Sequence, residues 1–471
     1  MVAEGLTPDN PADAVEAAFA ASLDALVAAL PADVPHHRLI SAVSGGPDSM
    51  CLAALAGDYA AARGLEHRAI IIDHGIRPES AVEAARVRSR LLRLGMRADI
   101  VNVADPAPKT GIQAWARSAR YAHLLEAARG DRAVLLLGHH RDDQAETVMM
   151  RLSRGSGLAG LAAMRGATMR DSVALLRPLL DLDRDALRRY CAARGIAFES
   201  DPSNADRRFE RVRVRQWLAG AEAEAKPEAR VQAGAVTGSH LLRLSHAAAA
   251  IDDQLVAAFR RHGLLPPPQP GGHMVLPAAS LDIAEAGLMR LLGRVIGQIT
   301  APPHPPTLAA LARLAARLSD GRVSTLGGAR FTRHPRGWLV TAEEGRRPLR
   351  LQLAAGQSAI FAGTWRVTSP VMAAVRRLGE EGSGAGAPWR ECRGWMDLPP
   401  LARRAVPVLQ TLDGTLLYPH LSPKAQPCEN IDEAVAEFLP SSLAIDETMA
   451  ATRDLKQTAA GMPWPGAVKP V

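Results

Sequence analysis

The stretch SGGPDSM, residues 44–50, is the part of the sequence that decides the predicted fold. It follows a short apolar run and opens a helical pattern, and its two glycines allow positive φ and a close backbone approach. Consecutive N–H groups at the start of a helix can hold phosphate oxygens. We therefore interpret the stretch as a phosphate-binding loop between a strand and a helix. The residues expected at the phosphates are Ser44, Gly45, Gly46, Pro47, Asp48 and Ser49.

Asp48 is an acid inside this anion site. Its presence makes sense if it holds a Mg²⁺ ion that bridges the phosphates. The loop is not a Walker loop, because no Gly-Lys-Ser or Gly-Lys-Thr follows the glycines. The alternative interpretation is a tight strand–helix turn that Asp or Ser caps. The complete SGGPDS string in its strand–helix context favours phosphate binding.

Apolar runs of about five residues alternate with helical patterns as far as residue 154. This alternation is typical of βαβ units, and it predicts an α/β, Rossmann-like fold with a mostly parallel sheet and helices on both faces. The expected strands are 39–43, 68–72, 98–103 and 133–137; the expected helices are 13–30, 49–63, 80–94, 112–128 and 142–154. Ligands bind at the carboxyl ends of such strands. We therefore expect Ser44–Ser49, Asp73–His74 and His139–Asp143 along one edge of the sheet.

The pattern of apolar and polar residues changes after residue 220. An Ala-rich stretch to Phe259 predicts helix, and short alternating runs from Arg322 onward predict small β-rich or mixed modules. Gly379–Pro388 is expected to be a flexible loop or linker. The predicted domains are an N-terminal extension with an amphipathic helix (1–35), a catalytic domain (36–220), a helical linker and substrate-recognition domain (221–345), and a small C-terminal module (346–471).

Charge and cysteine content narrow the class of protein. The 471 residues include 56 Lys and Arg against 49 Asp and Glu, a formal net charge of +7. Such a balance favours association with nucleic acid, although a merely basic surface is the equal alternative. The four cysteines are far apart and form no CxxC pair, which argues against structural zinc, an iron–sulfur cluster and a disulfide framework.

No apolar run is long enough to predict a membrane span. The first residues carry acids and lack the basic region of a signal peptide. We therefore expect a cytoplasmic protein, and no obligate protein partner is predicted.

The SGGPDS loop resembles the PP-loop of the N-type ATP pyrophosphatase superfamily, whose members split ATP into AMP and pyrophosphate and leave an adenylated intermediate. Further segments resemble the tRNA(Ile)-lysidine synthetase family within it. These segments are IIDHGIRPES (71–80), GIQAWARSARYAHL (111–124), LLGHHRDDQAETVMMRLSRGSGLAGLAAM (136–164), RPLLDLDRDALRRYC (177–191) and DPSN…RFER (201–211). The resemblance covers about residues 38–218. A weaker similarity at TLGGARF (325–331) suggests the C-terminal modules of the family, expected to bind tRNA.

The resemblance implies a specific reaction. ATP, with Mg²⁺, would adenylate the 2-position carbonyl oxygen of the wobble cytidine in an isoleucine tRNA with a CAU anticodon. The ε-amine of free L-lysine would then attack that carbon and release AMP. The product, lysidine, pairs with A, so that the tRNA reads AUA instead of AUG.

The resemblance also assigns site residues. Asp48, His139, Asp143 and Glu146 occupy the catalytic positions of the family. Asp143 and Glu146 lie three apart, hence on one face of a helix, where a carboxylate could orient or deprotonate the lysine amine. His139 could bind phosphate or the nucleobase. Asp142 is expected to be the N-cap of this helix, and a metal site at His139–Asp143 is the less favoured alternative.

Arginines supply the remaining predicted contacts. Arg117 and Arg120 lie three apart on one helix and are predicted, with Asp73 and His74, in the nucleotide site; a surface pair is the alternative. The dense basic stretch after residue 206 suits a tRNA backbone, or else it is an exposed helix face. It comprises Arg207, Arg208, Arg211, Arg213 and Arg215. Val212 departs from the family, which usually has Asn at this position.

Two other functions stay open on the residues alone. A PP-loop tRNA thiolase usually needs paired cysteines for a sulfur carrier or a cluster, and the sequence has no CxxC pair. A non-catalytic module that binds ATP or tRNA would not need the intact loop together with His139, Asp143 and Glu146. Both are therefore less favoured than the lysidine-forming ligase.

Overall fold

The structure is a computed structural model that describes residues 11–199, 210–224, 237–343, 350–379, 395–419 and 434–439, with gaps at 33, 105, 109, 171–172, 303–304, 363 and 396. It divides into two compact units; within the described residues, one extends up to Asp253 and the other begins at Gln254. Each unit is described by itself, and the predicted domain boundaries stay predictions. Among the described helices, none combines the length and apolar character that crossing a membrane requires.

The first unit alternates strands and helices through most of its length. Its elements are α1 (Pro11–Ala28), β1 (Arg38–Val43), α2 (Pro47–Arg63), β2 (Glu66–Asp73), α3 (Ser80–Arg93), β3 (Arg97–Asn102), α4 (Ile112–Gly130), β4 (Val134–Leu136), α5 (Arg141–Leu152), α6 (Leu158–Leu161), β5 (Ala167–Arg170), β6 (Val173–Leu176), α7 (Arg184–Ala193), α8 (Glu210–Glu224) and α10 (Gly238–Arg261), the last of which runs across the boundary between the units. The predicted strands and helices up to residue 154 are confirmed.

The strands form one six-stranded sheet in the order β3-β2-β1-β4-β6-β5. All neighbouring pairs are parallel except β5 with β6. The strand order reverses between β1 and β4, which makes this pair the topological switch point where doubly wound sheets bind ligands. The loops that follow β1 and β4 therefore lie side by side. The predicted α/β fold class is confirmed.

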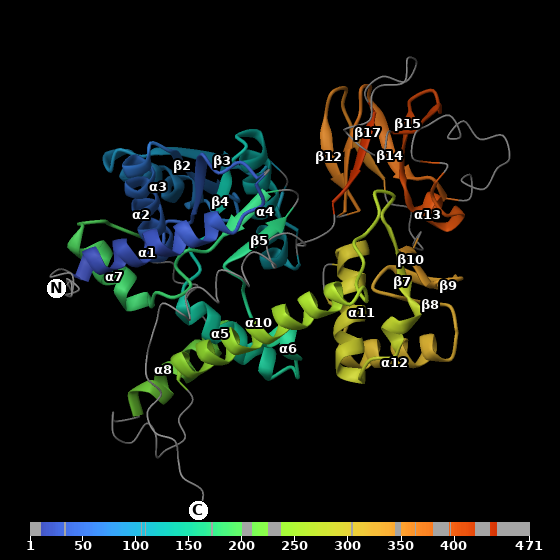
Figure 1. The fold of residues 1–471 in the computed structure, drawn as a ribbon. Helices are drawn as coiled ribbons and strands as arrows, with labels where there is room; N and C mark the ends of the chain where they lie inside the picture. Colours follow the sequence, from blue (N-terminus) through green and yellow to red (C-terminus); the bar gives the residue numbers. More distant parts are fainter. Residues whose placement is uncertain are drawn as a thin grey trace, which may run out of the picture. The chain divides into compact units, whose positions relative to one another are not determined.

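Alternate residues of the strands face two different apolar layers. In β1, Leu39 and Val43 pack in one core with residues of α1, α2, α3 and α7, whereas Ile40 packs in a second core with residues of α4. Helices therefore cover both faces of the sheet (Figure 1). Because both faces are buried, the central strands are apolar nearly throughout.

Helix α1 belongs to the larger of these layers. Its residues Val15, Phe19, Leu23 and Leu26 are buried in the same core as α2, and the Phe19 ring meets the Tyr59 ring of α2 edge-on at 6.1 Å. The spacing of four and three residues places these side chains on one face of the helix. The amphipathic N-terminal helix thus contributes to the core of the sheet domain.

The second unit begins with helices packed on a small antiparallel sheet. The elements are β7 (His273–Pro277), η2 (Ala278–Leu281), α11 (Glu285–Thr300), α12 (Leu308–Ser319), β8 (Ser324–Leu326), β9 (Ala329–His334) and β10 (Gly337–Ala342), in the sheet order β7-β10-β9-β8. Side chains such as Leu291, Ile296, Phe331 and Trp338 form its core. The predicted alternating runs after Arg322 are therefore strands.

Two further small sheets complete the described chain. They contain β11 (Leu351–Leu353), β12 (Ser358–Phe361), β13 (Trp365–Thr368), β14 (Ala373–Arg377), β15 (Pro407–Thr411), β16 (Leu416–Leu417) and β17 (Val435–Phe438), with α13 (Pro400–Ala405) beside them in sequence. Their orders are β11-β14-β15-β16 and β12-β13-β17. Most of the predicted linker Gly379–Pro388 lies outside the described residues.

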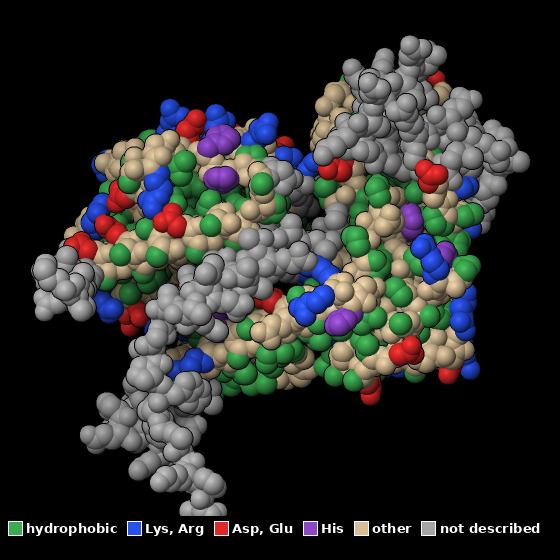
Figure 2. Space-filling model, viewed as in Figure 1, with side chains coloured by type: hydrophobic (Ala, Val, Ile, Leu, Met, Phe, Trp, Pro, Cys, Tyr) green, Lys and Arg blue, Asp and Glu red, His purple; other side chains and the backbone are tan. Residues whose placement is uncertain are grey.

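Positive and negative side chains are intermixed on the face of the molecule that Figure 2 shows. Several acidic side chains are already paired with arginine, for example Asp24 with Arg63 at 2.8 Å and Asp99 with Arg68 at 3.0 Å. The positive side chains on this face therefore do not form a single basic patch.

Candidate active site at the carboxyl edge of the sheet

The PP-loop is shaped by one glycine with a positive φ. Gly45 has φ +87°, and an added Cβ would lie 2.6 Å from Cγ2 of Val87. Gly46 instead has φ −71° and ψ 164°, so that only Gly45 needs the freedom that we expected for both. The Ser49 hydroxyl donates to the carbonyl of Gly46 at 3.0 Å and accepts from the Ser44 N–H at 3.1 Å. Ser49 therefore closes the loop on itself.

Helix α2 begins directly behind this loop. Pro47 is its first residue, where the missing N–H costs nothing, and the N-cap is Gly46, which has no side chain to satisfy the free N–H groups. Such a helix start attracts anions through its exposed amides and its dipole. The loop geometry supports the predicted phosphate contact, which stays a prediction for the individual residues.

The turn between β4 and α5 lies against the PP-loop. A Cβ added at Gly138 would lie 3.3 Å from the carbonyl oxygen of Asp48 and 3.4 Å from Cα of Ser49. Only a glycine allows this approach without displacement of the backbone. The expectation that the segments after β1 and β4 meet at one edge is confirmed by this contact.

His140 connects the two segments through its side chain. Its Nε2 atom lies 3.4 Å from Oδ2 of Asp48 and 3.5 Å from Oδ2 of Asp143, and its Nδ1 atom lies 3.3 Å from Oδ2 of Asp142. The imidazole is 1% exposed. Burial opposes its charge, but hydrogen bonds to Asp142 and Asp48 outweigh burial and raise the pKa of His140 to about 9. A buried imidazolium thus lies among three carboxylates.

His140, and not Asp142, is the N-cap of α5. The Asp143 carboxylate accepts the backbone N–H of His140 at 3.1 Å, which is one half of a capping box. Nδ1 of His140 lies 3.2 Å from the backbone nitrogen of Asp142, and it can accept that N–H only when the ring is neutral. Asp142 instead accepts the N–H of Arg184 at the start of α7, at 2.9 Å. The expected cap was wrong because Asp142 is used to join two helices.

Asp143 lies between this histidine and an arginine. Its pKa is held below the ordinary value, because the charges of His140 and Arg211 outweigh burial, which raises it. Nη2 of Arg211 lies 3.3 Å from Oδ1 of Asp143. Asp143 is therefore an ionised, hydrogen-bonded carboxylate, and a weak base at neutral pH.

Glu146 lies one turn farther into α5 and is 1% exposed. Three arginines converge on its carboxylate. Nε of Arg211 lies 2.7 Å from Oε2, Nε of Arg215 lies 2.6 Å from Oε1, and Nη2 of Arg184 lies 3.4 Å from Oε1. Arg215 makes a second contact to Oε2 at 3.3 Å, which completes a forked pair. Glu146 therefore joins α5 to both α7 and α8.

A second group of positive charges surrounds His139. Burial lowers the pKa of His139 to about 4, and the nearby charges of Arg177, Arg211 and Arg117 act in the same direction. The ring is therefore neutral at pH 7, and its Nδ1 atom is buried without a hydrogen-bond partner in the described part of the chain. A ligand with a matching donor or acceptor would complete its hydrogen bonding.

His74 and the α4 arginines lie in the same neighbourhood. Burial and the charge of Arg120 lower the pKa of His74, and its ring lies 6.2 Å from the Trp115 ring. Neither ring nitrogen of His74 has a hydrogen-bond partner among the described residues. Arg117 lies over the Tyr121 ring, 5.2 Å from its centroid. Asp73 accepts the N–H of Gly75 at 2.9 Å and shapes the turn after β2.

The basic stretch after residue 206 is only partly described. Arg207 and Arg208 lie outside the described residues. Arg211 and Arg215 point to the carboxylates of α5, whereas Arg213 is exposed on α8. Val212 is 7% exposed and therefore buried.

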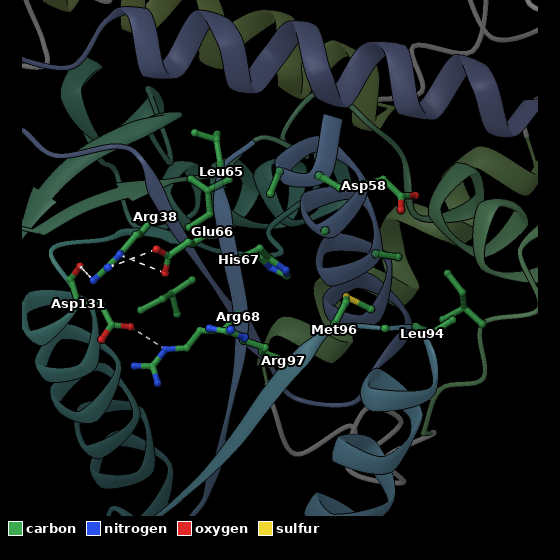
Figure 3. Close-up of a pocket in the computed structure, with 18 of the residues that line it drawn as sticks. Arg38, Asp58, Leu65, Glu66, His67, Arg68, Leu94, Met96, Arg97 and Asp131 are labelled. Atoms are coloured by element: carbon green, nitrogen blue, oxygen red, sulfur yellow. Dashed lines mark hydrogen bonds and ion pairs between the residues drawn. The ribbon is translucent and has the colours of Figure 1, made fainter. Parts of the chain in front are cut away.

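A cavity of about 630 Å³ lies at the opposite, amino edge of the sheet (Figure 3). Its charged side chains pair with one another, for example Arg38 with Glu66 at 3.2 Å and Arg68 with Asp131 at 2.7 Å. His67 points toward this cavity and shares a hydrogen bond of 2.9 Å with Ser41. None of the predicted site residues lines it, and the carboxyl edge remains the candidate active site.

Sequence reasoning overlooked three residues of the site. Arg177 directly follows β6, so that the strand-end rule that selected His139 would also have selected it. His140 was passed over in favour of its neighbours, and Arg184 carries no local signal because its partner Glu146 is far away in the sequence. No group of three or more His, Cys, Asp or Glu suited to a metal ion occurs in the described ranges.

The chain was compared with known proteins. The PP-loop domain family matches residues 16–222. The tRNA(Ile)-lysidine synthase of Ruegeria pomeroyi is 34% identical over 367 residues, which are 76% of this chain and 83% of the relative. That of Methylobacterium nodulans is 40% identical over 302 residues, 62% of this chain and 86% of the relative. That of Rhodopseudomonas palustris is 48% identical over 189 residues, 40% and 55% of the two chains.

Proposed function

Because the chain belongs to the tRNA(Ile)-lysidine synthase family, we propose that it joins free L-lysine to carbon 2 of the wobble cytidine in a tRNA(Ile) with a CAU anticodon. ATP drives the reaction through an adenylated tRNA intermediate and leaves as AMP and pyrophosphate. The modified tRNA then reads AUA instead of AUG. We place this ATP-dependent ligase in the cytoplasm, where tRNA and ATP are available.

One observation carries the proposal. The PP-loop acid Asp48 and the α5 acid Asp143 both lie within 3.5 Å of the same imidazole, His140. The first belongs to the segment expected to hold the ATP phosphates, and the second to the segment expected to hold the lysine. A ligase with two chemical steps needs both groups around one reaction centre, since proximity and orientation supply much of the rate.

The donor set fits a divalent cation at Asp48. Oδ1 of Asp48 is buried and has no hydrogen-bond partner in the described part of the chain, whereas Oδ2 faces His140. An oxygen with this environment suits Mg²⁺, which proteins hold through one or two carboxylates together with phosphates. When bound, the ion would neutralise charge that develops on the phosphates.

The other residues divide between the two substrates. We assign the neutral ring of His139, with the arginines beside it, to hydrogen bonding and charge stabilisation at the phosphate and the nucleobase during adenylation. Asp73, His74, Arg117 and Arg120 complete the nucleotide side of this proposal. Asp143 remains ionised, so that it suits the binding of the lysine ammonium group better than its deprotonation.

The ion pairs of Glu146 suggest a supporting role. Both of its oxygens accept from arginine, and its side chain is almost completely buried. We propose that Glu146 acts by holding Arg211 and Arg215, whose side chains are 38% and 31% exposed. These arginines are then within reach of substrate phosphate while their position is fixed.

Incubation with ATP, labelled lysine and a CAU-anticodon tRNA, followed by nucleoside analysis, tests the function. Labelled lysidine at the wobble position is the expected result, with one AMP per product. A matched tRNA with a CAC anticodon is the control and should take up no label. Release of AMP without transfer of lysine to the tRNA would contradict the ligase assignment.

The role of Asp48 is tested in the same assay. Asp48→Asn keeps the shape of the side chain but removes its charge, so that AMP formation should fall at least a hundredfold while the protein stays folded. In electron paramagnetic resonance with Mn²⁺ and ATP, the native protein should bind Mn²⁺ and the variant should not. Near-native turnover at saturating Mg²⁺ would remove Asp48 from the mechanism.

A further inference from the structure

Helix α8 exposes a large aromatic side chain close to the candidate site. Trp217 is 49% exposed, whereas Trp338, Trp365 and Trp395 are at most 3% exposed and Trp115 is half-buried. No ring contact of Trp217 occurs with another described residue. Tryptophan is among the residues most often found at binding surfaces, because an indole ring that is exposed to water offers a large apolar surface and one hydrogen-bond donor.

Part of the surface of α8 is buried, which explains why the helix lies where it does. Val214 and Leu218 pack with Ala145 and Val148 in one apolar cluster, so that this side of the helix is buried against α5. The side chain of Trp217 contributes nothing to that cluster. The packing of α8 therefore does not account for a tryptophan at position 217.

The inner face of α8 also reaches the reaction site. Arg211 and Arg215 contact the carboxylate of Glu146 from this helix. Trp217 follows Arg215 by two residues. The exposed indole is therefore on the same turns of α8 as the arginines that contact the α5 carboxylates.

The outer face carries charge as well as the indole. Arg213 precedes Trp217 by four residues, which places the two side chains next to each other on the helix surface, and both are exposed. A cation beside a flat aromatic surface is the combination that single-stranded nucleic acid requires, because the backbone meets the charge and a base stacks on the ring. A protein partner would need a larger apolar patch than one indole.

We propose that Trp217 stacks on an unpaired base of the tRNA anticodon loop and, with Arg213, forms an RNA-docking surface on the outer face of α8. This inference rests on the proposed function, since it takes a tRNA anticodon arm as the substrate. Sequence-specific proteins bind RNA mainly at loops, whose bases can leave the stack and lie on aromatic side chains. An anticodon arm is wider than an α-helix, so that it can present one loop base to the site and another to Trp217.

Binding of a labelled 17-nucleotide anticodon stem-loop, followed by fluorescence anisotropy, tests the surface without any chemistry. Trp217→Ala should weaken binding on the order of tenfold, as expected for the loss of one stacked base, and Trp217→Phe should retain most of the affinity. Leu92→Ala removes a comparably exposed apolar side chain, 48% exposed on α3, and should bind like the native protein.

The dependence of stem-loop affinity on salt concentration distinguishes the contribution of base stacking from that of charge. The loss caused by Trp217→Ala should be the same factor at 50 and at 200 mM salt, because stacking releases few counterions. Arg213→Ala should instead flatten the dependence of affinity on salt. A stem-loop with abasic sites throughout the loop should bind the native protein and Trp217→Ala equally well.

Tryptophan emission provides a direct readout. A base stacked on the indole quenches its fluorescence, so that Trp217→Phe should remove most of the quenching that the stem-loop causes, although the variant still binds. If Trp217→Ala bound the stem-loop with native affinity, the proposed RNA-docking surface would be wrong. If Trp217→Ala lowered the Tm of the protein without weakening binding, the indole would pack against another part of the chain instead of against RNA. The two proposals can fail separately. If the native protein makes lysidine but Trp217→Ala binds the stem-loop as tightly as the native protein does, this inference is overturned and the proposed function remains.

Discussion

Nε2 of His140 lies 3.4 Å from Oδ2 of Asp48, so that the N-cap residue of α5 is tied to the acid of the PP-loop. The same ring lies 3.5 Å from Asp143. One buried side chain therefore sets the distance between the segment that is expected to bind ATP and the segment that is expected to bind lysine. Several consequences of this arrangement can be measured.

Replacement of His140 should damage the reaction more than the fold. His140→Ala removes the charged donor that lies between the carboxylates of Asp48 and Asp143. We expect pyrophosphate release to fall at least tenfold, with a modest decrease in Tm. His140→Gln places an amide nitrogen near the position of Nε2 and can still donate to Asp48, so that it should recover part of the rate. Native activity in the alanine variant would show that the contact is not needed.

The two glycines of the PP-loop should respond differently to the same substitution. Gly45→Ala places a side chain at φ +87° and against Val87, which should cost about 1–3 kcal/mol of stability. Gly46→Ala is the matched control, since its φ is −71° and the nearest atom to an added Cβ is 3.9 Å away. Thermal unfolding should show a lower Tm for the first variant only. Equal Tm values would contradict the loop geometry.

Removal of the Glu146 carboxylate leaves several arginines without their buried counter-charge. Breaking such a pair from one side typically costs about 3–5 kcal/mol, so that Glu146→Ala should unfold at a clearly lower denaturant concentration. Glu146→Gln keeps the shape and should lose less. In a double-mutant cycle, Arg215→Gln should cost less in the Glu146→Gln background than in the native one. Strictly additive losses would mean that the two side chains do not interact.

His67, at the opposite edge of the sheet, predicts a pH dependence of stability. Burial lowers its pKa to about 4. The unfolded chain, with a histidine pKa near 6.5, therefore binds more protons than the folded chain between about pH 4 and 6.5. Stability should fall as the pH decreases through this window, by up to about 3 kcal/mol from this residue.

The measurement is denaturant unfolding of the native protein and of His67→Gln between pH 4.5 and 7. Glutamine keeps a polar group near Ser41 but does not titrate, so that the variant should show a flatter profile of stability against pH. His36→Gln changes an exposed histidine and is the matched control. Parallel profiles for the native protein and His67→Gln would show that His67 does not contribute.

The elements around the PP-loop were predictable because each signal is local. The run Leu39–Val43 and the helix after Pro47 differ from the observed elements by one or two residues at most, and the strand–helix alternation determines the class of sheet. The antiparallel pair of β5 and β6 was not predicted, since each strand has only four residues. Such short runs do not show a clear period.

The candidate site was predictable in its members but not in its contacts. The motif positions identify Asp143 and Glu146, yet nothing near them in the sequence shows that one faces His140 and the other is surrounded by arginines. Arg211 and Glu146 are 65 residues apart in the sequence, and their contact depends on the packing of α8 against α5. The role of a residue whose partner is far away in the sequence can therefore be seen only in the structure.

The close approach of Gly138 to the backbone of Asp48 has a consequence for how this active site can be altered. A Cβ at position 138 would lie 3.3 Å from the carbonyl oxygen of Asp48, so that even Gly138→Ala requires one of the two segments to give by a few tenths of an ångström. The two segments therefore fit each other closely, although about ninety residues separate them in the sequence. Grafting of a PP-loop from another protein into this scaffold should succeed only when the donor's turn after β4 is transplanted together with it.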